Sequence, residues 1–196
     1  FMAEIGFEMY QKILDEAIRE LKRSSFRDLF KEEIAKQDDF VQDCAIDTDL
    51  EILIPDSYVE SITERLSLYT RLDNCKNEAE IQAFSAEMQD RFGPVPPQVG
   101  GLFDALRCRL IAVGLGFERI ALKEGTLKCY FINNPVSPYF ESAVFRSILD
   151  FIQTQTNKAR LRQNGKLFML LVRDVESMRQ TLDLLQRMKA FVDNDR

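Results

Sequence analysis

Residues 56–117 read DSYVESITERLSLYTRLDNCKNEAEIQAFSAEMQDRFGPVPPQVGGLFDALRCRLIAVGLGF, and they contain three helix patterns separated by strong helix-ending signals. We expect Ser57 to cap the first helix, with Glu60 at the reciprocal position of a capping box. An apolar residue recurs every three or four positions, as expected for one face of a helix. These residues are Ile62, Leu66, Tyr69 and Leu72.

The second helix is expected to begin after Asn77, with Glu80 in the reciprocal capping position, and to end at Gly93 and Pro94. Its apolar stripe consists of Ile81, Phe84, Met88 and Phe92. At about 100° per residue, a second set falls on the side that faces away from this stripe. That set is Glu80, Ala83, Glu87 and Asp90, so the second helix is predicted to present an acidic outer face.

The third helix is predicted to begin after Pro96 and Pro97 and to end at Gly114 and Gly116. Its apolar positions are Val99, Leu102, Phe103, Leu106, Leu110 and Val113. Arg107 and Arg109 point away from that stripe.

Residues 45–54 alternate between apolar and polar side chains, as a half-buried strand does. Asp47, Asp49 and Glu51 fall on one side of this strand. Three carboxylates about 6.6 Å apart could bind a divalent cation only if loops supplied further oxygens. A solvated acidic strand face is the simpler interpretation, and a metal-assisted hydrolase built on these carboxylates is the enzymatic alternative.

After residue 116 the pattern changes to hairpins. Segments 117–123 and 126–132 flank Glu124 and Gly125, which suit a tight turn. A helix capped by Ser137, with Pro138 at its first position, should follow. Its inward residues are expected to be Phe140, Val144, Ile148, Phe151 and Gln155.

A second hairpin is predicted for ARLRQ-NG-KLFMLLV, because Asn164-Gly165 is the pair that a type I′ turn prefers. Asp174 is expected to cap the last helix. Its apolar residues are Val175, Met178, Leu182, Leu185 and Met188. The order of strand, three helices, hairpin, helix, hairpin and helix predicts an α+β domain whose sheet is covered by helices on one side.

The N-terminal part is expected to be separate from that domain. Residues 1–22 have an amphipathic helix pattern, and a lone helix must pack on the main domain, on another copy or on a neighbour outside this chain. Residues 23–43 lack a clear period and are predicted to be a linker. The domain itself should therefore span 44–196.

Composition limits the possible chemistry. The chain has 196 residues, 45% of them hydrophobic, and a formal net charge of −6. No segment is apolar and long enough for a membrane span, and no secretion signal is present, so a cytoplasmic protein is expected. The absence of histidine excludes catalytic triads built on that residue. The four cysteines are Cys44, Cys75, Cys108 and Cys129; they form no CxxC pair, so we expect reduced thiols and no metal site.

Neither nucleotides nor nucleic acids are strongly indicated. No phosphate-binding glycine motif occurs, so the chain is not a nucleotide-driven motor by itself. Its basic residues do not segregate obviously along the sequence. Arg160, Arg162 and Lys166 cluster around the second hairpin with Lys158 nearby, but no aromatic residue alternates with them on the exposed side. A solvated hairpin tip is the simpler interpretation, and a nucleic-acid contact through the Arg160–Lys166 hairpin is the alternative.

Glu87 and Asp90 are three residues apart on an exposed helix face, so their side chains are neighbours. Nothing in the sequence predicts a pocket that would raise the pKa of either carboxyl. The pair is either a solvated surface feature or a docking site for a partner's arginines, because two fixed carboxylates match the guanidinium fork.

Three segments also carry a family resemblance. RLSLYTRL at 65–72, DRFGPVPPQV at 90–99 and LGFERI at 115–120 resemble the C-terminal domain of the bacterial transcription-repair coupling factor, Mfd. The likeness covers about residues 47–188, and the DRFG segment is its most specific part. Upstream, GFEMY at 6–10 and the pattern that follows resemble the end of the motor module of the same family.

The resemblance implies a protein-binding role. Members of this family are ATP-dependent DNA translocases that displace stalled RNA polymerase and recruit UvrA, with ATP and Mg²⁺ bound by the motor module. This segment would then bind no cofactor and catalyse nothing itself. In the family, acidic residues before the DRFG segment contact a basic surface of the N-terminal UvrB-like module and hide the UvrA-binding surface. Glu87 and Asp90 occupy those positions, and Glu80 shares their face.

Overall fold

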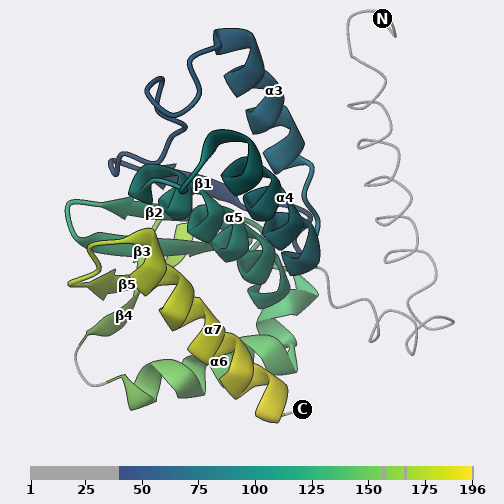
Figure 1. Ribbon diagram of the computed structural model, residues 1–196. Coiled ribbons are helices and arrows are strands. Elements are labelled where there is room, and N and C mark those ends of the chain that lie inside the picture. Colours follow the sequence, from purple (N-terminus) through teal and green to yellow (C-terminus); the bar gives the residue numbers. More distant parts are fainter. Residues whose placement is uncertain (1–39, 156–157, 166, 196) are drawn as a thin grey trace, which may run out of the picture. The chain divides into compact units, whose positions relative to one another are not determined.

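The computed structural model describes residues 40–155, 158–165 and 167–195 (Figure 1). The predicted helix at 1–22 and most of the predicted linker lie outside these residues. Within them the elements follow in the order β1 (Ala45–Thr48), α3 (Ile62–Asp73), α4 (Glu78–Phe92), α5 (Pro97–Leu115), β2 (Phe117–Lys123), β3 (Thr126–Phe131), the 3-10 turn η1 (Pro138–Glu141), α6 (Ala143–Thr154), β4 (Ala159–Asn164), β5 (Leu167–Arg173) and α7 (Met178–Asn194). The predicted α+β order is confirmed.

The five strands form one sheet with the spatial order β1-β2-β3-β5-β4. β1 pairs with β2 in parallel, whereas the other three pairs are antiparallel. A parallel pair cannot be joined by a tight turn, so the chain needs a long crossover between β1 and β2. Helices α3, α4 and α5 form that crossover.

Both predicted hairpins are present. Between β2 and β3 the backbone turns at Glu124 and Gly125, whose φ angles of 49° and 68° suit a tight turn with the twist of the strands. In the second hairpin Asn164 pairs with Leu167, so the turn lies one residue later than expected. Gly165 takes the left-handed conformation there, with φ 60°.

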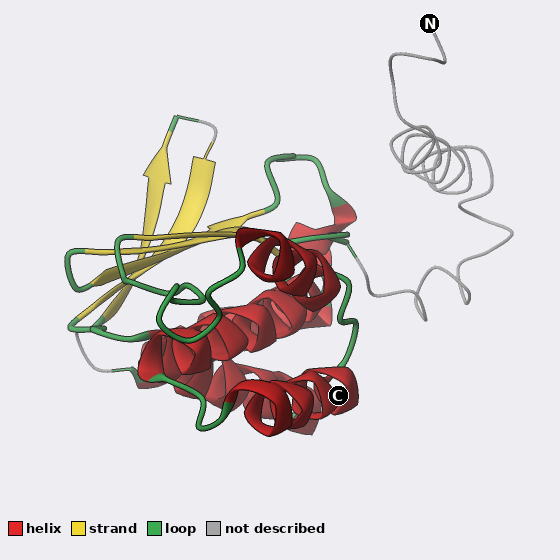
Figure 2. Cartoon of the chain, turned by 45° about the horizontal axis from the view of Figure 1, so that its top comes forward, coloured by secondary structure: helices red, strands yellow, loops and turns green. Residues whose placement is uncertain are grey.

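The helices gather on one side of the sheet (Figure 2). One core forms between that sheet face and α5, α6 and α7. Its buried members include Ile120, Leu127, Phe131, Leu170, Cys108, Ala112, Ile148, Leu182, Leu185 and Met188. A second cluster joins α3, α4 and α5 and includes Leu68, Leu72, Ile81, Phe84, Met88, Val99, Phe103 and Leu106. Because α5 contributes to both clusters, it fixes the crossover helices to the sheet.

The start of α3 differs from the prediction. Ser61 is the N-cap, and its side-chain oxygen accepts a hydrogen bond of 3.2 Å from the Glu64 amide. Ser57 lies in a turn, since the amides of Tyr58 and Val59 both bond to the carbonyl of Pro55. The Tyr58 hydroxyl holds this turn against the end of α4.

The buried side of α3 also differs from the prediction. Ile62 and Leu66 were expected to be buried, but they are 67% and 62% exposed. Leu68 and Leu72 supply the buried side instead. The prediction that Ile62 and Leu66 belong to the buried stripe of this helix was therefore wrong.

Two further capping predictions were displaced by a few residues. Ser137 caps the 3-10 turn η1, and Ser142 caps the α-helix that follows. Ser177, rather than Asp174, caps α7, and its hydroxyl accepts from the Gln180 amide at 3.1 Å. The apolar residues predicted for α7 are buried, and so are Val144, Ile148 and Phe151 of α6. Phe140 and Gln155 were also expected to be inward, but Phe140 lies in η1, Gln155 follows the end of α6, and both are only half-buried.

The first strand is shorter than its alternation suggested. β1 ends at Thr48, whose side chain accepts a hydrogen bond from the Leu50 amide. This local bond turns the chain out of the sheet, as threonine hydroxyls commonly do. Asp49 and Glu51 consequently lie beyond the strand and do not continue the face of Asp47.

Candidate functional site

Helix α4 begins as the sequence predicted. The Asn77 side-chain oxygen accepts from the Glu80 amide at 3.0 Å, and the Glu80 carboxylate accepts from the Lys76 amide at 2.6 Å. The helix ends at Gly93, which has φ 87°. These two signals fix the rotation of the helix and therefore the direction in which Glu87 and Asp90 point.

The exposure of α4 follows the predicted two faces. Ile81, Phe84 and Met88 are buried. Glu80, Ala83 and Asp90 are exposed, and Glu87 is half-buried at the border facing α3. The predicted carboxylates therefore lie on the outer side of the helix, but they differ in their surroundings.

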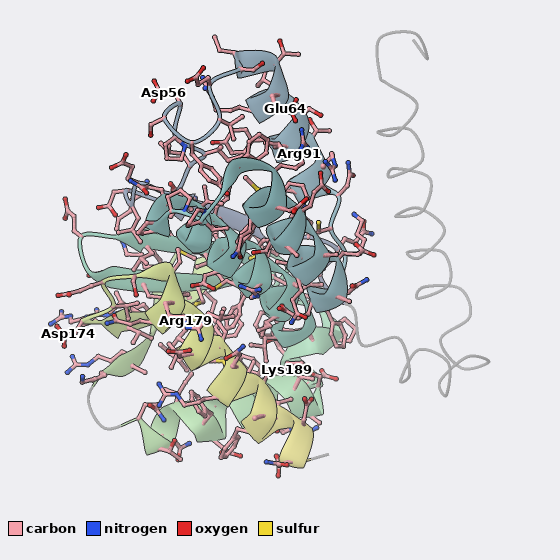
Figure 3. The ribbon with its side chains drawn as sticks, viewed as in Figure 1. Asp56, Glu64, Arg91, Asp174, Arg179 and Lys189 are labelled. Atoms are coloured by element: carbon pink, nitrogen blue, oxygen red, sulfur yellow. The ribbon has the colours of Figure 1, made fainter. Side chains whose placement is uncertain are left out.

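Glu87 is bound by two arginines of the same domain. Arg71 of α3 donates to both of its oxygens, at 2.8 and 2.5 Å, and Arg91 donates at 3.1 Å. Arg91 also reaches Glu64 of α3 at 2.7 Å, and Figure 3 shows these two labelled residues side by side. The bonds from Arg71 lower the pKa of the Glu87 carboxyl to about 2.

Aromatic rings hold the two arginines in place. The guanidinium of Arg71 lies 5.1 Å from the ring centroid of Phe84, and that of Arg91 lies 4.8 Å from Phe92. Such contacts orient the planar guanidinium in addition to its ion pairs. This network was not predicted, although Arg71 and Arg91 both lie in the last turn of their helices, where the helix dipole favours cations.

The three predicted carboxylates therefore play different parts. Glu80 completes the cap of α4, and Glu87 belongs to the network with Arg71 and Arg91. The side chain of Asp90 makes no hydrogen bond or ion pair within residues 40–155, 158–165 and 167–195. Asp90 is thus the carboxylate of this face that is available to a partner without any rearrangement.

The carboxylates near β1 do not converge. Asp47 binds Arg119 at 2.7 Å and Lys123 at 2.8 Å, and these bonds lower the pKa of its carboxyl. Asp49 accepts instead from the Glu124 amide at 2.9 Å. Within the described parts of the chain, no group of three or more His, Cys, Asp or Glu side chains is placed to hold a metal ion.

The four cysteines are buried free thiols. Burial raises the pKa of each, and it raises the pKa of Cys44 to about 12. A thiol that stays protonated at neutral pH is a poor nucleophile. These side chains therefore contribute to packing.

A cavity of about 620 Å³ lies where β1, α3 and α5 meet. Its walls are mostly apolar and include Ile46, Ile52 and Leu102. Arg109 lies at this cavity and binds both Asp43 and Asp73. The charged groups at the cavity bind one another, and burial keeps the Cys44 thiol, which also lines it, protonated at neutral pH. This cavity could not be predicted from the sequence, because its lining comes from three separate segments.

Comparisons with known proteins follow the same segments. The TRCF domain family matches residues 48–141. A transcription-repair-coupling factor from Rickettsia conorii is 31% identical over 165 residues, which are 84% of this chain and 13% of that protein. The one from Escherichia coli is 25% identical over 187 residues, or 95% of this chain and 15% of the relative. The chain thus spans about one seventh of the length of these relatives.

The fold has a close counterpart among solved structures. A crystal structure of the C-terminal domain of a transcription-repair coupling factor superposes with a TM-score of 0.62 at 17% identity. The match covers 78% of this chain and 93% of that one. None of the described helices is long and apolar enough to cross a membrane.

Proposed function

Since the chain belongs to the transcription-repair-coupling factor family, as its C-terminal domain, we propose that it regulates the parent protein by docking on another module of it. The docking surface is the outer face of α4, with Asp90 and Glu87 as the contacting carboxylates. The partner is the N-terminal UvrB-like module, and docking masks the surface that binds UvrA. The observation that carries this proposal is the free, exposed carboxylate of Asp90 beside a carboxylate that is held rigidly.

The geometry at Glu87 leaves room for a partner. A carboxylate offers about four acceptor positions, and Arg71 and Arg91 use three of them. An arginine of the partner can take the remaining one while it also binds Asp90, three residues along the helix. Because the side chain of Glu87 is already fixed, binding orders only one mobile carboxylate, Asp90, and so costs less conformational entropy than it would with two mobile side chains.

Docking acts as a switch between two states. In the closed state the UvrA surface is covered, and in the open state it is free. A closed state favoured by about 2.7 kcal/mol holds about 99% of the molecules, and a loss of that preference makes both states equally populated. Two well-placed arginine–carboxylate contacts can supply a difference of this size.

In this proposal, other modules of the parent protein carry out its activities on DNA and RNA polymerase. The parent moves along DNA with energy from ATP and displaces stalled RNA polymerase, and its motor module binds ATP and Mg²⁺. The present domain supplies no reactive centre to these steps. Movement of the motor breaks the docking contact, and UvrA then binds in the cytoplasm where the parent works.

The test is UvrA binding by the full-length protein that carries Asp90→Arg, alone and together with Glu87→Arg. The single variant leaves the Arg71–Glu87 network intact, so it changes the docking face without disturbing the fold. We expect UvrA affinity to rise about tenfold or more with either variant, because a like charge opposes the partner arginines.

A matched double variant controls for the change in net charge. Asp150 and Glu176 are exposed carboxylates outside α4, so Asp150→Arg with Glu176→Arg should leave UvrA affinity unchanged. Equal UvrA affinity in the wild type and the Asp90→Arg variant, at unchanged thermal stability, would rule the docking proposal out.

A further inference from the structure

The two faces of the sheet differ completely in charge. Strand residues that pair directly lie on the same face, and the register therefore assigns every strand position to one side. The face that contacts the helices is apolar. Its residues include Ile46, Ile120, Leu122, Leu127, Cys129, Phe131, Leu170, Val172 and Leu161.

The opposite face is basic. Of its strand positions, six are cations and one is a carboxylate, Asp47. The cations are Arg119, Lys123, Lys128, Arg160, Arg162 and Arg173. We call these six residues the basic sheet face. In a chain with a net charge of −6, this is a strong local segregation of charge.

The fold therefore corrects two expectations from the sequence. Basic residues do segregate, because two hairpins that are distant in sequence, β2–β3 and β4–β5, bring them together on one sheet. An aromatic residue does share their face: Tyr130 pairs with Met169, which pairs with Arg162 on the next strand. The guanidinium of Arg119 lies 5.3 Å from the Tyr130 ring centroid on the other side.

The cations nearest to β4 are the most available. Arg160, Arg162 and Arg173 are exposed, and none of them has an ion pair with another described residue. On the β2 side, by contrast, Asp47 binds Arg119 and Lys123. On the basic sheet face, the positive charge that no described carboxylate neutralises therefore lies on strands β3, β5 and β4.

The spacing of these cations suits a chain of phosphates. Alternate residues of a strand are about 6.6 Å apart, and neighbouring strands are about 4.8 Å apart, so cations repeat in two directions over a flat area. Arginine binds phosphate through two parallel hydrogen bonds. A ring in the middle of such an area can stack against a base, as on the sheets that bind single-stranded RNA.

We propose that the basic sheet face binds single-stranded nucleic acid, with phosphates on Arg160, Arg162 and Lys128 and a base against Tyr130. A duplex is a stiff cylinder and touches a flat face along one line, whereas a single strand can follow several strands of the sheet. An acidic protein partner fits less well. In the centre of the face Ala121 and Met169 are only 7% and 8% exposed and Leu171 is half-buried, so the apolar surface that a protein interface could bury is concentrated at Leu167, 40% exposed, near the end of the second hairpin.

The experiment measures binding of a fluorescent 12-nucleotide oligo-dT to the 196-residue chain by anisotropy at several salt concentrations. We expect Arg160→Gln with Arg162→Gln to weaken binding at least tenfold at low salt. The slope of log K against log salt should become shallower by about 1.4, since each lost phosphate contact on a single strand accounts for about 0.7.

Tyr130 and the helix face provide matched comparisons. Tyr130→Leu should weaken binding about tenfold with the salt slope unchanged, and Tyr130→Phe should retain the affinity, because stacking requires only the ring. Arg146→Gln with Arg187→Gln makes the same charge change on the exposed sides of α6 and α7 and should leave the affinity and slope as they are.

Three results would overturn the proposal. The first is a loss of affinity in the Arg146/Arg187 control as large as that in the Arg160/Arg162 variant, which would mean that binding depends on net charge alone. The second is binding of a 12-base-pair duplex as tight as that of the single strand. The third is tighter binding of a poly-glutamate peptide, which would assign the face to an acidic protein. None of these assays involves UvrA or α4, so they stand apart from the docking test.

Discussion

The ring of Tyr139 occupies the space that a side chain on Gly116 would need. A Cβ atom at Gly116 would lie 2.2 Å from Cε2 of Tyr139, far inside van der Waals contact. The Tyr139 hydroxyl also donates a hydrogen bond of 2.6 Å to the carbonyl of Leu115, the last residue of α5. This contact locks the 3-10 turn before α6 onto the junction between α5 and β2.

Gly116→Ala should destabilise the domain strongly. Gly116 has φ 82°, and a left-handed conformation costs about 1–2 kcal/mol for a residue with a Cβ. Overpacking against the Tyr139 ring adds about 1–3 kcal/mol. Urea denaturation of the two proteins measures the sum. Gly114→Ala is the matched control, because Gly114 lies within α5 with open space around its Cα, and it should stabilise by about 0.5–1 kcal/mol. Similar stabilities for the two variants would contradict the close packing of the Tyr139 ring against Gly116.

The two leucines of α3 provide a direct test of its buried side. Leu68 is 1% exposed and Leu66 is 62% exposed. Leu68→Ala should cost about 2–5 kcal/mol of unfolding free energy, the range for large-to-small core changes. Leu66→Ala should change it by about 0.5 kcal/mol or less, as exposed substitutions do. Chemical denaturation measures both losses. A larger loss for Leu66→Ala than for Leu68→Ala would mean that Leu66 lies on the buried side, as the sequence pattern predicted.

Removal of Arg71 should raise the pKa of Glu87. The Arg71 bonds are the main reason that this pKa is about 2 rather than 4.5. We therefore expect Arg71→Gln to move it upward toward 4.5, which a carbon-detected NMR titration of the carboxyl can follow. Arg107→Gln is the control, because Arg107 binds Glu78 instead, and it should leave the titration of Glu87 unchanged.

The same shift sets a pH dependence of stability. The pKa of Glu87 is lower in the folded domain than in the unfolded chain, so its ion pairs stabilise the fold fully above about pH 4.5 and lose that effect as the pH falls toward 2. The stability difference between wild type and Glu87→Gln should follow this window. It should be about 1 kcal/mol or less, because the side chains remain partly exposed. A difference that grew on acidification would contradict the assignment.

The thiols should react slowly in the folded chain. Cys108 and Cys129 are 0% exposed and Cys75 is 8% exposed, and burial raises the pKa of all three. With a thiol reagent at pH 8 we expect Cys75 to be modified first and the other two only at the rate of unfolding. In denaturant all four cysteines should react at once. Rapid reaction of Cys108 in the native protein would show that the α5 core opens.

Local signals predicted much of this fold because the interactions behind them are local. The box of Asn77 and Glu80, the glycine after Phe92 and the Glu124-Gly125 turn each involve residues within a few positions of one another, and all three were found. The family resemblance of RLSLYTRL and DRFGPVPPQV is confirmed by the match over residues 48–141. Where two serines could cap a helix, as at Ser57 and Ser61, local chemistry could not choose between them.

In such cases distant contacts made the choice. Ser57 lies in the turn that the Tyr58 hydroxyl holds by donating to the carbonyls of Met88 and Gly93, about thirty residues further along the chain, and Ser61 caps α3 after that turn. In the same way, the charge of Glu87 was visible in the sequence, but its capture by Arg71 was not, since their meeting depends on how α3 packs against α4.

The sequence by itself determined the order of the elements, the two hairpins, the outward direction of Asp90 and the family. The tertiary structure alone decided which side of α3 is buried, how Glu87 is neutralised and that six scattered cations share one face of the sheet. The physical reason is that periodicity reports which residues of one element lie together. The face they share with another element is set by strand register and helix packing, which depend on contacts between segments far apart in the chain.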